Sequence, residues 1–205
     1  MRISTLFVFL AAFTACFGQN RDDRKVLLFF GDSITAGYGL PREASFPALI
    51  RQTLETESPN WRVVNQGLSG DTTSGGVARV QRSVLLFPSV VVLELGGNDG
   101  LRGLPLKSTR ANLEKLILAF KNGGAKVVLA GMSLPPNYGP DYIQGFEQIF
   151  KDLAAKYKLP FIRFLLADMI TKDLRYFQPD GIHPTAEGAE IVAKTVLKTV
   201  RPLLK

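Results

Sequence analysis

Short apolar runs alternate with longer amphipathic segments along this chain. Residues 26–30 are apolar throughout, and residues 90–95 form the strongest of the later runs. Runs of this length without polar alternation are typical of strands buried on both faces. Such strands, separated by amphipathic helices, predict a parallel sheet with helices on both sides. That arrangement is an α/β fold of three layers.

The same patterns set approximate limits for the elements. Ser45, Ser108 and Thr185 stand where a side chain can cap the start of a helix, and Gly123-Gly124 can end one. Strands are expected at residues 26–30, 62–65, 90–95, 126–130 and 161–164. Helices are expected at residues 46–57, 74–86, 109–122, 142–157 and 186–203.

The length of 205 residues suits one domain, which is expected to occupy residues 21–205. Residues 1–20 have a different character. Arg2 is followed by a largely apolar run, residues 3–17, that is too short to span a bilayer. A basic residue, an apolar stretch and small residues in this order predict a secretory signal. The protein is therefore expected to be exported, to the bacterial periplasm or out of the cell.

Cys16, the only cysteine, lies at the end of the apolar run. The sequence Phe13-Thr14-Ala15-Cys16 resembles a bacterial lipoprotein signal, although Phe13 stands where leucine is usual. In such signals the cysteine becomes the lipidated first residue, which would attach this protein to a membrane. The alternative is an ordinary signal cut near Gly18, which discards Cys16. Either outcome leaves a mature chain without a disulfide bond.

The formal net charge is +7, and removal of residues 1–15 lowers it only to +6 because Arg2 is the one charged residue lost. Most basic residues are scattered, but a modest cluster comprises Lys194, Lys198, Arg201 and Lys205. A solvated helix face explains such a cluster, and the alternative is a weak preference for anionic lipid surfaces or acidic substrates. Aromatic residues and arginines do not interleave as they do in nucleic-acid-binding proteins. No nucleic-acid partner is expected, and nothing requires more than a monomer.

Four polar, glycine-containing segments follow predicted strands. Three follow a strand directly, and the fourth comes after the fifth strand and a short helix. Because the carboxyl ends of parallel strands share one edge of the sheet, these remote segments are expected to meet there. Each segment alone is typical of a turn, but four at matched strand ends indicate a site. The segments are residues 31–34, 67–71, 96–99 and 180–183.

Ser33 is the candidate nucleophile, because it follows a buried strand and can present its hydroxyl above the sheet. A serine hydroxyl needs a base at neutral pH, and His183 is the only histidine in the chain. An imidazole base needs a partner on its other nitrogen, and Asp180 lies three residues earlier. These three residues together predict nucleophilic catalysis by serine.

A tetrahedral intermediate also needs hydrogen-bond donors for its oxyanion. The backbone N–H groups of Ser33 and Gly70 and the side-chain amide of Asn98 can supply three. Asp32 and Asp99 flank these donors and are interpreted as groups that orient the loops at the substrate site.

Other kinds of site fit the sequence poorly. One histidine and one cysteine that is expected to be processed cannot supply the usual zinc ligands, so neither a metal nor a cofactor is expected. The glycine-rich stretch 69–76 lacks the Lys-Ser/Thr ending of a phosphate-binding P-loop. Thr35 occupies the second glycine position of the Gly-x-Ser-x-Gly motif, which excludes the nucleophile elbow of α/β-hydrolases.

Four longer segments resemble the ordered motifs of the SGNH (GDSL-type) hydrolases, close to the branch of thioesterase I, lysophospholipases and arylesterases. Ile34 stands where leucine is usual, which is a conservative change. The resemblance covers nearly all of residues 26–203. It implies a flavodoxin-like sheet of five parallel strands and the same roles for Ser33, Asp180, His183, Gly70 and Asn98. The matching segments are residues 31–39, 69–72, 95–103 and 180–184.

The resemblance also implies a substrate class, namely acyl and aryl esters, thioesters and lysophospholipids. It implies that residues 133–142 form a mobile loop beside a groove for the acyl chain, with Leu134, Tyr138 and Tyr142 as apolar contacts. A plain surface loop is the alternative for this segment. Two other functions stay open: a carbohydrate O-deacetylase of the same superfamily, and a catalytically silent, surface-anchored binding module.

Overall fold

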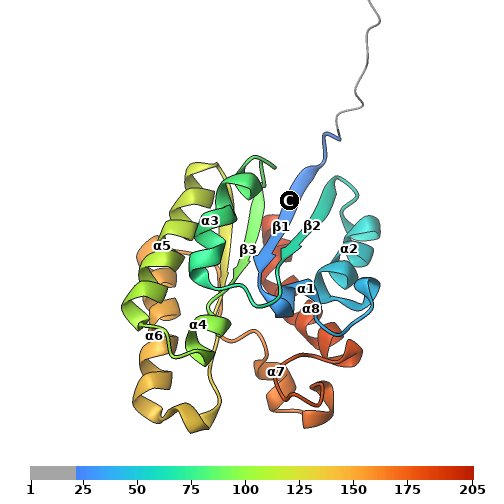
Figure 1. The fold of residues 1–205 in the computed structure, drawn as a ribbon. Helices are drawn as coiled ribbons and strands as arrows, with labels where there is room; N and C mark the ends of the chain where they lie inside the picture. Colours follow the sequence, from blue (N-terminus) through green and yellow to red (C-terminus); the bar gives the residue numbers. More distant parts are fainter. Residues whose placement is uncertain (1–21) are drawn as a thin grey trace, which may run out of the picture.

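Five parallel strands form one sheet in the order β2-β1-β3-β4-β5. This computed structural model describes residues 22–205 (Figure 1), so the predicted signal and Cys16 lie outside the described residues. The strand order is that of flavodoxin-like proteins, which confirms the predicted fold. The strands are β1 (Lys25–Gly31), β2 (Trp61–Gly67), β3 (Val90–Glu94), β4 (Lys126–Ala130) and β5 (Phe161–Ile162).

Helices cover both faces of the sheet, as predicted (Figure 1). One face carries α3 (Thr73–Val84), α5 (Leu106–Asn122) and α6 (Pro140–Tyr157). The other face carries α2 (Phe46–Glu57), α7 (Ala167–Ile170) and α8 (Ala186–Val200). Two short helices, α1 (Ser33–Ala36) and α4 (Gly97–Leu101), lie at strand ends. Short 3₁₀ turns are η1 (Arg42–Ala44), η2 (Pro136–Tyr138), η3 (Leu174–Tyr176) and η4 (Arg201–Leu203).

The interior strand β1, between β2 and β3, shows why its sequence is apolar throughout. Successive side chains of a strand point to opposite faces, and both faces of this strand are covered. Phe29 packs edge-to-face on Phe46 of α2, with ring centroids 5.4 Å apart. Phe30 packs in the same way on Phe120 of α5, at 5.2 Å, on the other side of the sheet. The neighbouring residues of one strand therefore join the two helical layers to a single core.

Helix starts differ from the predictions where proline or a neighbouring turn decides the cap. Helix α5 begins at Leu106 with Pro105 as its N-cap, so Ser108 lies in the first turn and its N–H donates to the Pro105 carbonyl at 2.9 Å. Ser45 is at the N-cap of α2, but its hydroxyl donates to the Arg42 carbonyl instead. Thr185 caps α8 as predicted, since its oxygen accepts from the N–H of Gly188.

The sheet has two edges of different character. The carboxyl ends of the strands carry the four polar segments, with α1 and α4 among them. At the amino edge, the described chain begins beside β1 and ends near it (Figure 1). No helix within residues 22–205 is both long enough and apolar enough to cross a bilayer.

Candidate active site

Ser33 is held by a tight turn between β1 and α1. Asp32 caps α1, because its Oδ1 accepts from the N–H of Ile34 at 3.1 Å. A side chain at position 31 would not fit: a Cβ on Gly31 would lie 2.1 Å from the hydroxyl of Thr35. The N–H of Ser33 is the first of α1 and therefore has no partner within the helix. Both the hydroxyl and the N–H of Ser33 are thus presented at the carboxyl edge.

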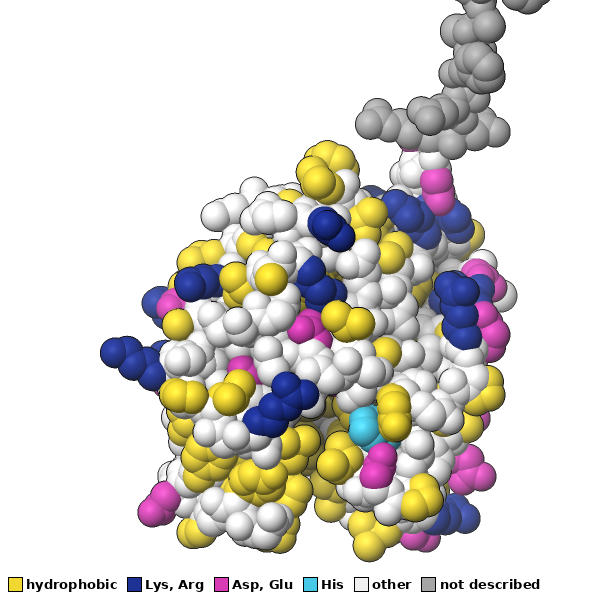
Figure 2. Space-filling model, viewed as in Figure 1, with side chains coloured by type: hydrophobic (Ala, Val, Ile, Leu, Met, Phe, Trp, Pro, Cys, Tyr) yellow, Lys and Arg dark blue, Asp and Glu magenta, His cyan; other side chains and the backbone are white. Residues whose placement is uncertain are grey.

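Ser33, His183 and Asp180 form one chain of hydrogen bonds. Ser33 Oγ lies 2.8 Å from His183 Nε2, and His183 Nδ1 lies 2.6 Å from Asp180 Oδ2. The side chain of His183 is 16% exposed. Figure 2 shows it, in cyan, beside a hollow with hydrophobic side chains on both sides. This arrangement can move a proton from a serine hydroxyl to an imidazole, with a carboxylate that fixes the tautomer.

Asp180 is kept ionised by its own loop. Its Oδ1 accepts from the N–H groups of Ile182 and His183, at 2.9 and 3.0 Å. Burial raises the pKa of Asp180, but these N–H groups and the ring of His183 outweigh burial and lower the pKa below its ordinary value. The carboxylate that faces the histidine is therefore charged at neutral pH.

Two residues that sequence reasoning missed hold the histidine loop in place. Gln178 Nε2 donates to the carbonyls of Tyr38 and Pro184, at 2.7 and 2.8 Å, and so joins the loop to the turn after α1. The ring of Tyr38 lies 4.6 Å from that of His183, centroid to centroid. Tyr38 lies within the segment that carries the family resemblance, whereas no local pattern marks Gln178.

Asn98 and Gly70 lie on the neighbouring loops. The amide of Asn98 donates to the Asp71 carbonyl at 3.0 Å, and its Nδ2 lies 3.4 Å from Asp32 Oδ2. The second contact is long, so one N–H of the amide is weakly held and can turn to a ligand. Gly70 has a φ of +79°, which is the left-handed region that glycine adopts without strain.

Arg102 connects these two loops, and sequence reasoning assigned it no role. Its Nη2 donates to the Gly70 carbonyl at 3.0 Å and lies 3.5 Å from Asn98 Oδ1. The guanidinium therefore fixes the position of the Gly70 peptide relative to the Asn98 amide. Arg102 itself is exposed, so its positive charge also faces solvent at the site.

Asp99 does not face a substrate. Its carboxylate is 2% exposed and accepts from the N–H of Thr73 at 2.8 Å, from the Thr73 hydroxyl and from the Thr109 hydroxyl. It joins α4 to the start of α3. The predicted role as a loop-orienting group fits these contacts, whereas direct contact with a substrate does not.

Glu94 is a buried carboxyl that the sequence pattern concealed within an apolar strand. Its Oε2 accepts from the Thr35 hydroxyl at 2.6 Å and from the N–H of Asp32 at 3.3 Å. Its Oε1 is buried without a hydrogen-bond partner in the described part of the chain. Burial raises the pKa of Glu94 well above its ordinary value, and the nearby Asp32 adds to this. Burial also raises the pKa of Asp32, to about 6.

The segment of residues 133–142 is tied to α4. The Tyr138 hydroxyl donates to the Leu101 carbonyl at 2.8 Å, and the Tyr142 hydroxyl lies 3.3 Å from the Leu104 carbonyl. The two rings stack with centroids 6.4 Å apart, and Leu134 is buried beneath α4 against Gly100. The three predicted contact residues thus share one flank of the site. The predicted mobility of the segment stays a prediction.

Among residues 22–205, no three histidine, cysteine or acidic side chains are grouped so that they could hold a metal ion. Cys16, the predicted lipidation site, lies outside the described residues.

Comparison with known proteins identifies the family. Residues 29–191 match the GDSL-like Lipase/Acylhydrolase family. The chain is 40% identical to Esterase TesA of Pseudomonas aeruginosa, over 88% of this chain and 90% of that protein. It is 38% identical to an arylesterase of Vibrio mimicus, over 89% and 94%. It is 34% identical to thioesterase 1/protease 1/lysophospholipase L1 of Escherichia coli, over 97% and 91%.

Solved structures of esterases have the same fold as this chain. A crystal structure of TesA superposes with a TM-score of 0.83 at 39% identity, covering 87% of this chain and 99% of that one. The esterase EstA from Pseudoalteromonas, in a structure described as inhibited by monoethylphosphonate, gives a TM-score of 0.82 at 28% identity, covering 88% and 98%. The chain is therefore an ester hydrolase that belongs to the GDSL-like lipase/acylhydrolase, or SGNH, family.

Proposed function

We propose that this protein hydrolyses carboxylic esters through an acyl intermediate on Ser33. The observation that carries the proposal is the continuous chain from Ser33 Oγ to His183 Nε2, at 2.8 Å, and from His183 Nδ1 to Asp180, at 2.6 Å. Nucleophile, base and orienting carboxylate are within hydrogen-bond reach in the order that serine hydrolysis needs.

The first half-reaction acylates the serine. Ser33 Oγ attacks the ester carbonyl carbon while its proton passes to His183 Nε2, and the carboxylate of Asp180 stabilises the imidazolium. The carbonyl oxygen becomes an oxyanion, which accepts hydrogen bonds from the N–H groups of Ser33 and Gly70 and from the amide of Asn98. Collapse of this intermediate breaks the ester bond, and the leaving alcohol or thiol takes the proton from His183.

The second half-reaction releases the acid. A water molecule gives its proton to His183 Nε2 and attacks the acyl carbon, and the same donors hold the second oxyanion. Ser33 then leaves with the proton from His183, which restores the enzyme. No step needs a metal or a cofactor.

The proposed substrates are aryl and acyl esters, with thioesters and lysophospholipids as further candidates. The relatives named esterase, arylesterase and thioesterase 1/protease 1/lysophospholipase L1 support this range. Tyr138 and Tyr142, which are partly buried and pack against the core that contains Leu134, offer apolar contacts for an acyl chain of small to medium length. A panel of aryl esters and thioesters graded by chain length, with acetylated sugars beside them, decides among these and the deacetylase alternative.

We also propose that the protein is exported and that Cys16 is lipidated, which would attach it to a membrane. Both proposals rest on the apolar run at residues 3–17 and on Phe13-Thr14-Ala15-Cys16. Mass spectrometry of the mature N-terminus distinguishes a lipidated Cys16 from a cut near Gly18. An uncleaved chain would contradict both.

Covalent labelling tests the catalytic proposal directly. A fluorophosphonate probe should add one adduct to the protein, mapped to Ser33 by peptide mass spectrometry, and Ser33→Ala should abolish it. The exposed Ser69, on a neighbouring loop of the same edge, provides the matched control: Ser69→Ala should label as the wild type does. Labelling that persists in Ser33→Ala would contradict the proposal, and a complete lack of labelling would favour the binding module.

A further inference from the structure

The amino edge of the sheet presents exposed apolar side chains beside the point where the described chain begins. Leu85 is 69% exposed and Phe87 is 75% exposed, and both lie in the turn between α3 and β3. Phe87 has a φ of +50°, an unfavourable conformation for a bulky residue, and its N–H donates to the Val84 carbonyl at 2.9 Å. This tight turn directs both side chains outward instead of into the core.

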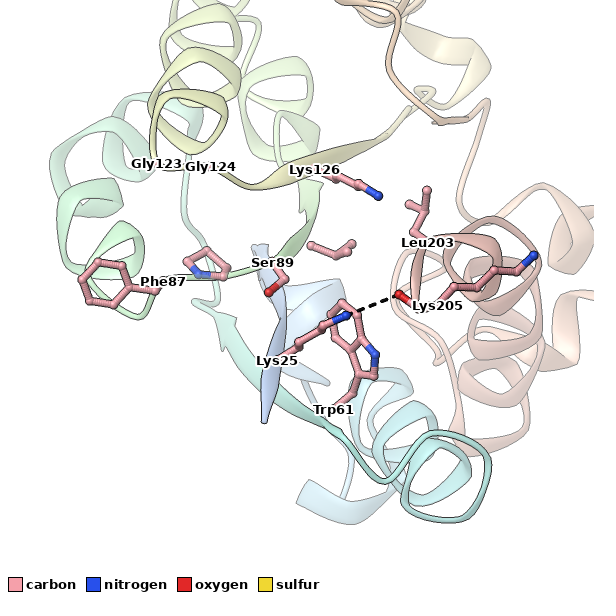
Figure 3. Close-up of a pocket in the computed structure, with 11 residues that line it drawn as sticks. Lys25, Trp61, Phe87, Ser89, Gly123, Gly124, Lys126, Leu203 and Lys205 are labelled. Carbon is pink, nitrogen blue, oxygen red and sulfur yellow. Dashed lines mark hydrogen bonds between the residues drawn. The ribbon is translucent and has the colours of Figure 1, made fainter. Parts of the chain in front are cut away.

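Lysines line two cavities at this edge, and Phe87 shares the lining of one of them. A cavity of about 350 Å³ at this edge is lined by Lys25, Lys126 and Lys205, with Phe87 at its margin (Figure 3). A second cavity, of about 240 Å³, shares Lys126 and adds Lys121 and Lys158. We call these five lysines, with Leu85 and Phe87, the amino-edge face.

The lysines of this face are not neutralised by nearby acids. Within residues 22–205, no side-chain carboxylate forms a salt bridge with any of the five. The contacts given for Lys25 are the main-chain oxygen of Lys205, at 3.4 Å, and the ring of Trp61, at 5.5 Å. Lys121 likewise donates to a main-chain carbonyl. The five lysines therefore have no side-chain carboxylate partner in the described part of the chain, although Lys25 and Lys121 already contact main-chain oxygens.

The basic cluster predicted from the C-terminal sequence is different. Arg201 pairs with Glu57 at 2.8 Å, and Lys198 lies 4.0 Å from Asp168. Of that cluster, only Lys205 lines a cavity of the amino-edge face. The charge that could attract anionic lipid thus comes from residues that are remote in sequence and meet at the starts of the strands.

Favourable placement at helix ends accounts for only part of this charge. Lys121 and Lys158 lie at the ends of α5 and α6, where a cation complements the helix dipole. Lys25 and Lys126 begin strands β1 and β4, where no such dipole acts. The dipole also gives no reason for the exposure of Leu85 and Phe87.

The position of the N-terminal segment indicates which surface this face meets. The described chain begins at Asp22, at this edge (Figure 1). If Cys16 carries lipid, only five residues separate it from Asp22. The six Cα–Cα steps from Cys16 to Asp22 span at most roughly 20 Å, so the amino edge would be held close to the bilayer.

We propose that the amino-edge face docks on a bilayer that contains anionic lipid. The side chains of Leu85 and Phe87 enter the interface, and the five lysines lie among the headgroups. In this orientation the carboxyl edge, with Ser33 and His183, faces away from the membrane. The proposal rests on the proposed export and lipidation of Cys16 for its choice of a membrane, and it is independent of the catalytic assignment.

Vesicle co-sedimentation tests the proposal with residues 22–205, so that no lipid anchor contributes. This segment contains the whole sheet and its core. The crystal structure of TesA aligns over 99% of its own chain with only 87% of this one, so the fold does not need the remaining residues. The vesicles are phosphatidylcholine alone, or equal parts of phosphatidylcholine and phosphatidylglycerol. We expect binding to the anionic vesicles only, weakened by added salt because exposed charges are screened.

Matched variants locate the contact. Leu85→Ser with Phe87→Ser should weaken binding to anionic vesicles by about tenfold or more, and Lys25→Gln with Lys126→Gln by a similar factor. Leu174 is also 75% exposed but lies in η3, away from this edge, so Leu174→Ser should bind as the wild type does. All variants should hydrolyse a soluble aryl ester at the wild-type rate, which also shows that they are folded.

Three results would overturn the proposal. One is the absence of binding to anionic vesicles, and another is equal loss of binding in Leu174→Ser. The third is a concentration-dependent dimer, detected by sedimentation, that Phe87→Ser disrupts while vesicle binding is unchanged; the face would then join two copies of the chain. Loss of esterase activity in Ser33→Ala has no bearing on these results, so the two proposals can fail separately.

Discussion

The two edges of the sheet differ in charge, in exposure and in how their polar groups are used. At the carboxyl edge, Asp32 and Asp99 are buried, and their carboxylates accept hydrogen bonds from the starts of α1 and α3. At the amino edge, lysines line open cavities and Phe87 is exposed to solvent. The polar groups of the carboxyl edge form hydrogen bonds with one another, whereas the charged groups of the amino edge face solvent.

This difference follows from the direction of the chain. In a parallel α/β fold every main helix starts near the carboxyl ends of the strands and ends near their amino ends. Helix N-termini offer N–H groups and partial positive charge, which stabilise carboxylates and oxyanions, and helix C-termini favour cations. The fold thus prepares one edge for developing negative charge and the other for basic side chains.

The largest expected effect is the loss of the serine or its base. Ser33→Ala or His183→Ala should lower kcat by about 10³-fold to 10⁶-fold, and the double variant should be hardly worse, because the pair acts as a unit. Steady-state kinetics on a soluble aryl ester measure this. Ser89→Ala, at the start of β3 on the amino edge, is the control and should keep the wild-type kcat. Additive losses in the double variant would show that the two residues do not share one step.

The second-largest effect on kcat is expected for Asn98, one of the proposed oxyanion donors. Asn98→Ala should lower kcat by about 10²-fold to 10³-fold with a smaller change in KM, because the amide stabilises the transition state more than the bound ester. Asn122→Ala removes an exposed amide at the amino edge and should change neither constant. An unchanged kcat in Asn98→Ala would remove this residue from the oxyanion hole and weaken the contrast between the edges.

The sequence was sufficient wherever local patterning determines structure. The apolar run at residues 26–30 predicted the buried strand β1, and four polar segments at strand ends predicted the residues that meet at the carboxyl edge. Family membership and the five-stranded fold are confirmed by the comparisons and by the strand order.

Contacts that depend on tertiary geometry could not be predicted from the sequence. Arg102 and Gln178 join loops that are remote in sequence. Arg102 lies within a segment that carries the family resemblance, but its contacts could not be read from that segment, and no local pattern marks Gln178. Glu94 was concealed because an apolar strand pattern tolerates one polar residue, and its carboxyl fits only because Gly31 has no side chain there. The start of α5 was misplaced because Pro105, not Ser108, ends the preceding loop.

A smaller effect is expected for Arg102, which contacts the donors rather than the proposed reaction centre. Arg102→Ala should lower kcat by about tenfold, because the Gly70 peptide and the Asn98 amide lose their common partner and shift relative to each other. Arg102→Lys should recover part of the loss, since lysine restores one donor without the fork of arginine. Arg82→Ala, an exposed arginine of α3 near the amino edge, is the control. A raised KM with unchanged kcat would instead place Arg102 in ground-state binding.

The smallest effect concerns stability and tests the buried acids beneath the carboxyl edge. Burial raises the pKa of Glu94 well above 4.5 and that of Asp32 to about 6, so the folded state binds these protons more tightly than the unfolded state. The stabilisation is fully present below the unfolded pKa values and is lost as pH rises through the folded ones. The free energy of unfolding should therefore decline from about pH 4 towards and beyond pH 6.

Glu94→Gln removes one of the two carboxyl groups that bind a proton more tightly in the folded state than in the unfolded state. Its unfolding free energy should fall less steeply with pH than that of the wild type, so the variant gains relative stability as pH rises, whatever its stability at low pH. Urea unfolding at a series of pH values measures the two slopes, and Glu190→Gln, on the exposed face of α8, controls for the loss of one carboxyl. Parallel slopes would mean that Glu94 is ionised in the folded protein. The carboxyl edge would then hold a buried negative charge beneath its oxyanion donors, and the hydrogen bonds to Glu94 would have to stabilise a carboxylate and not a neutral acid.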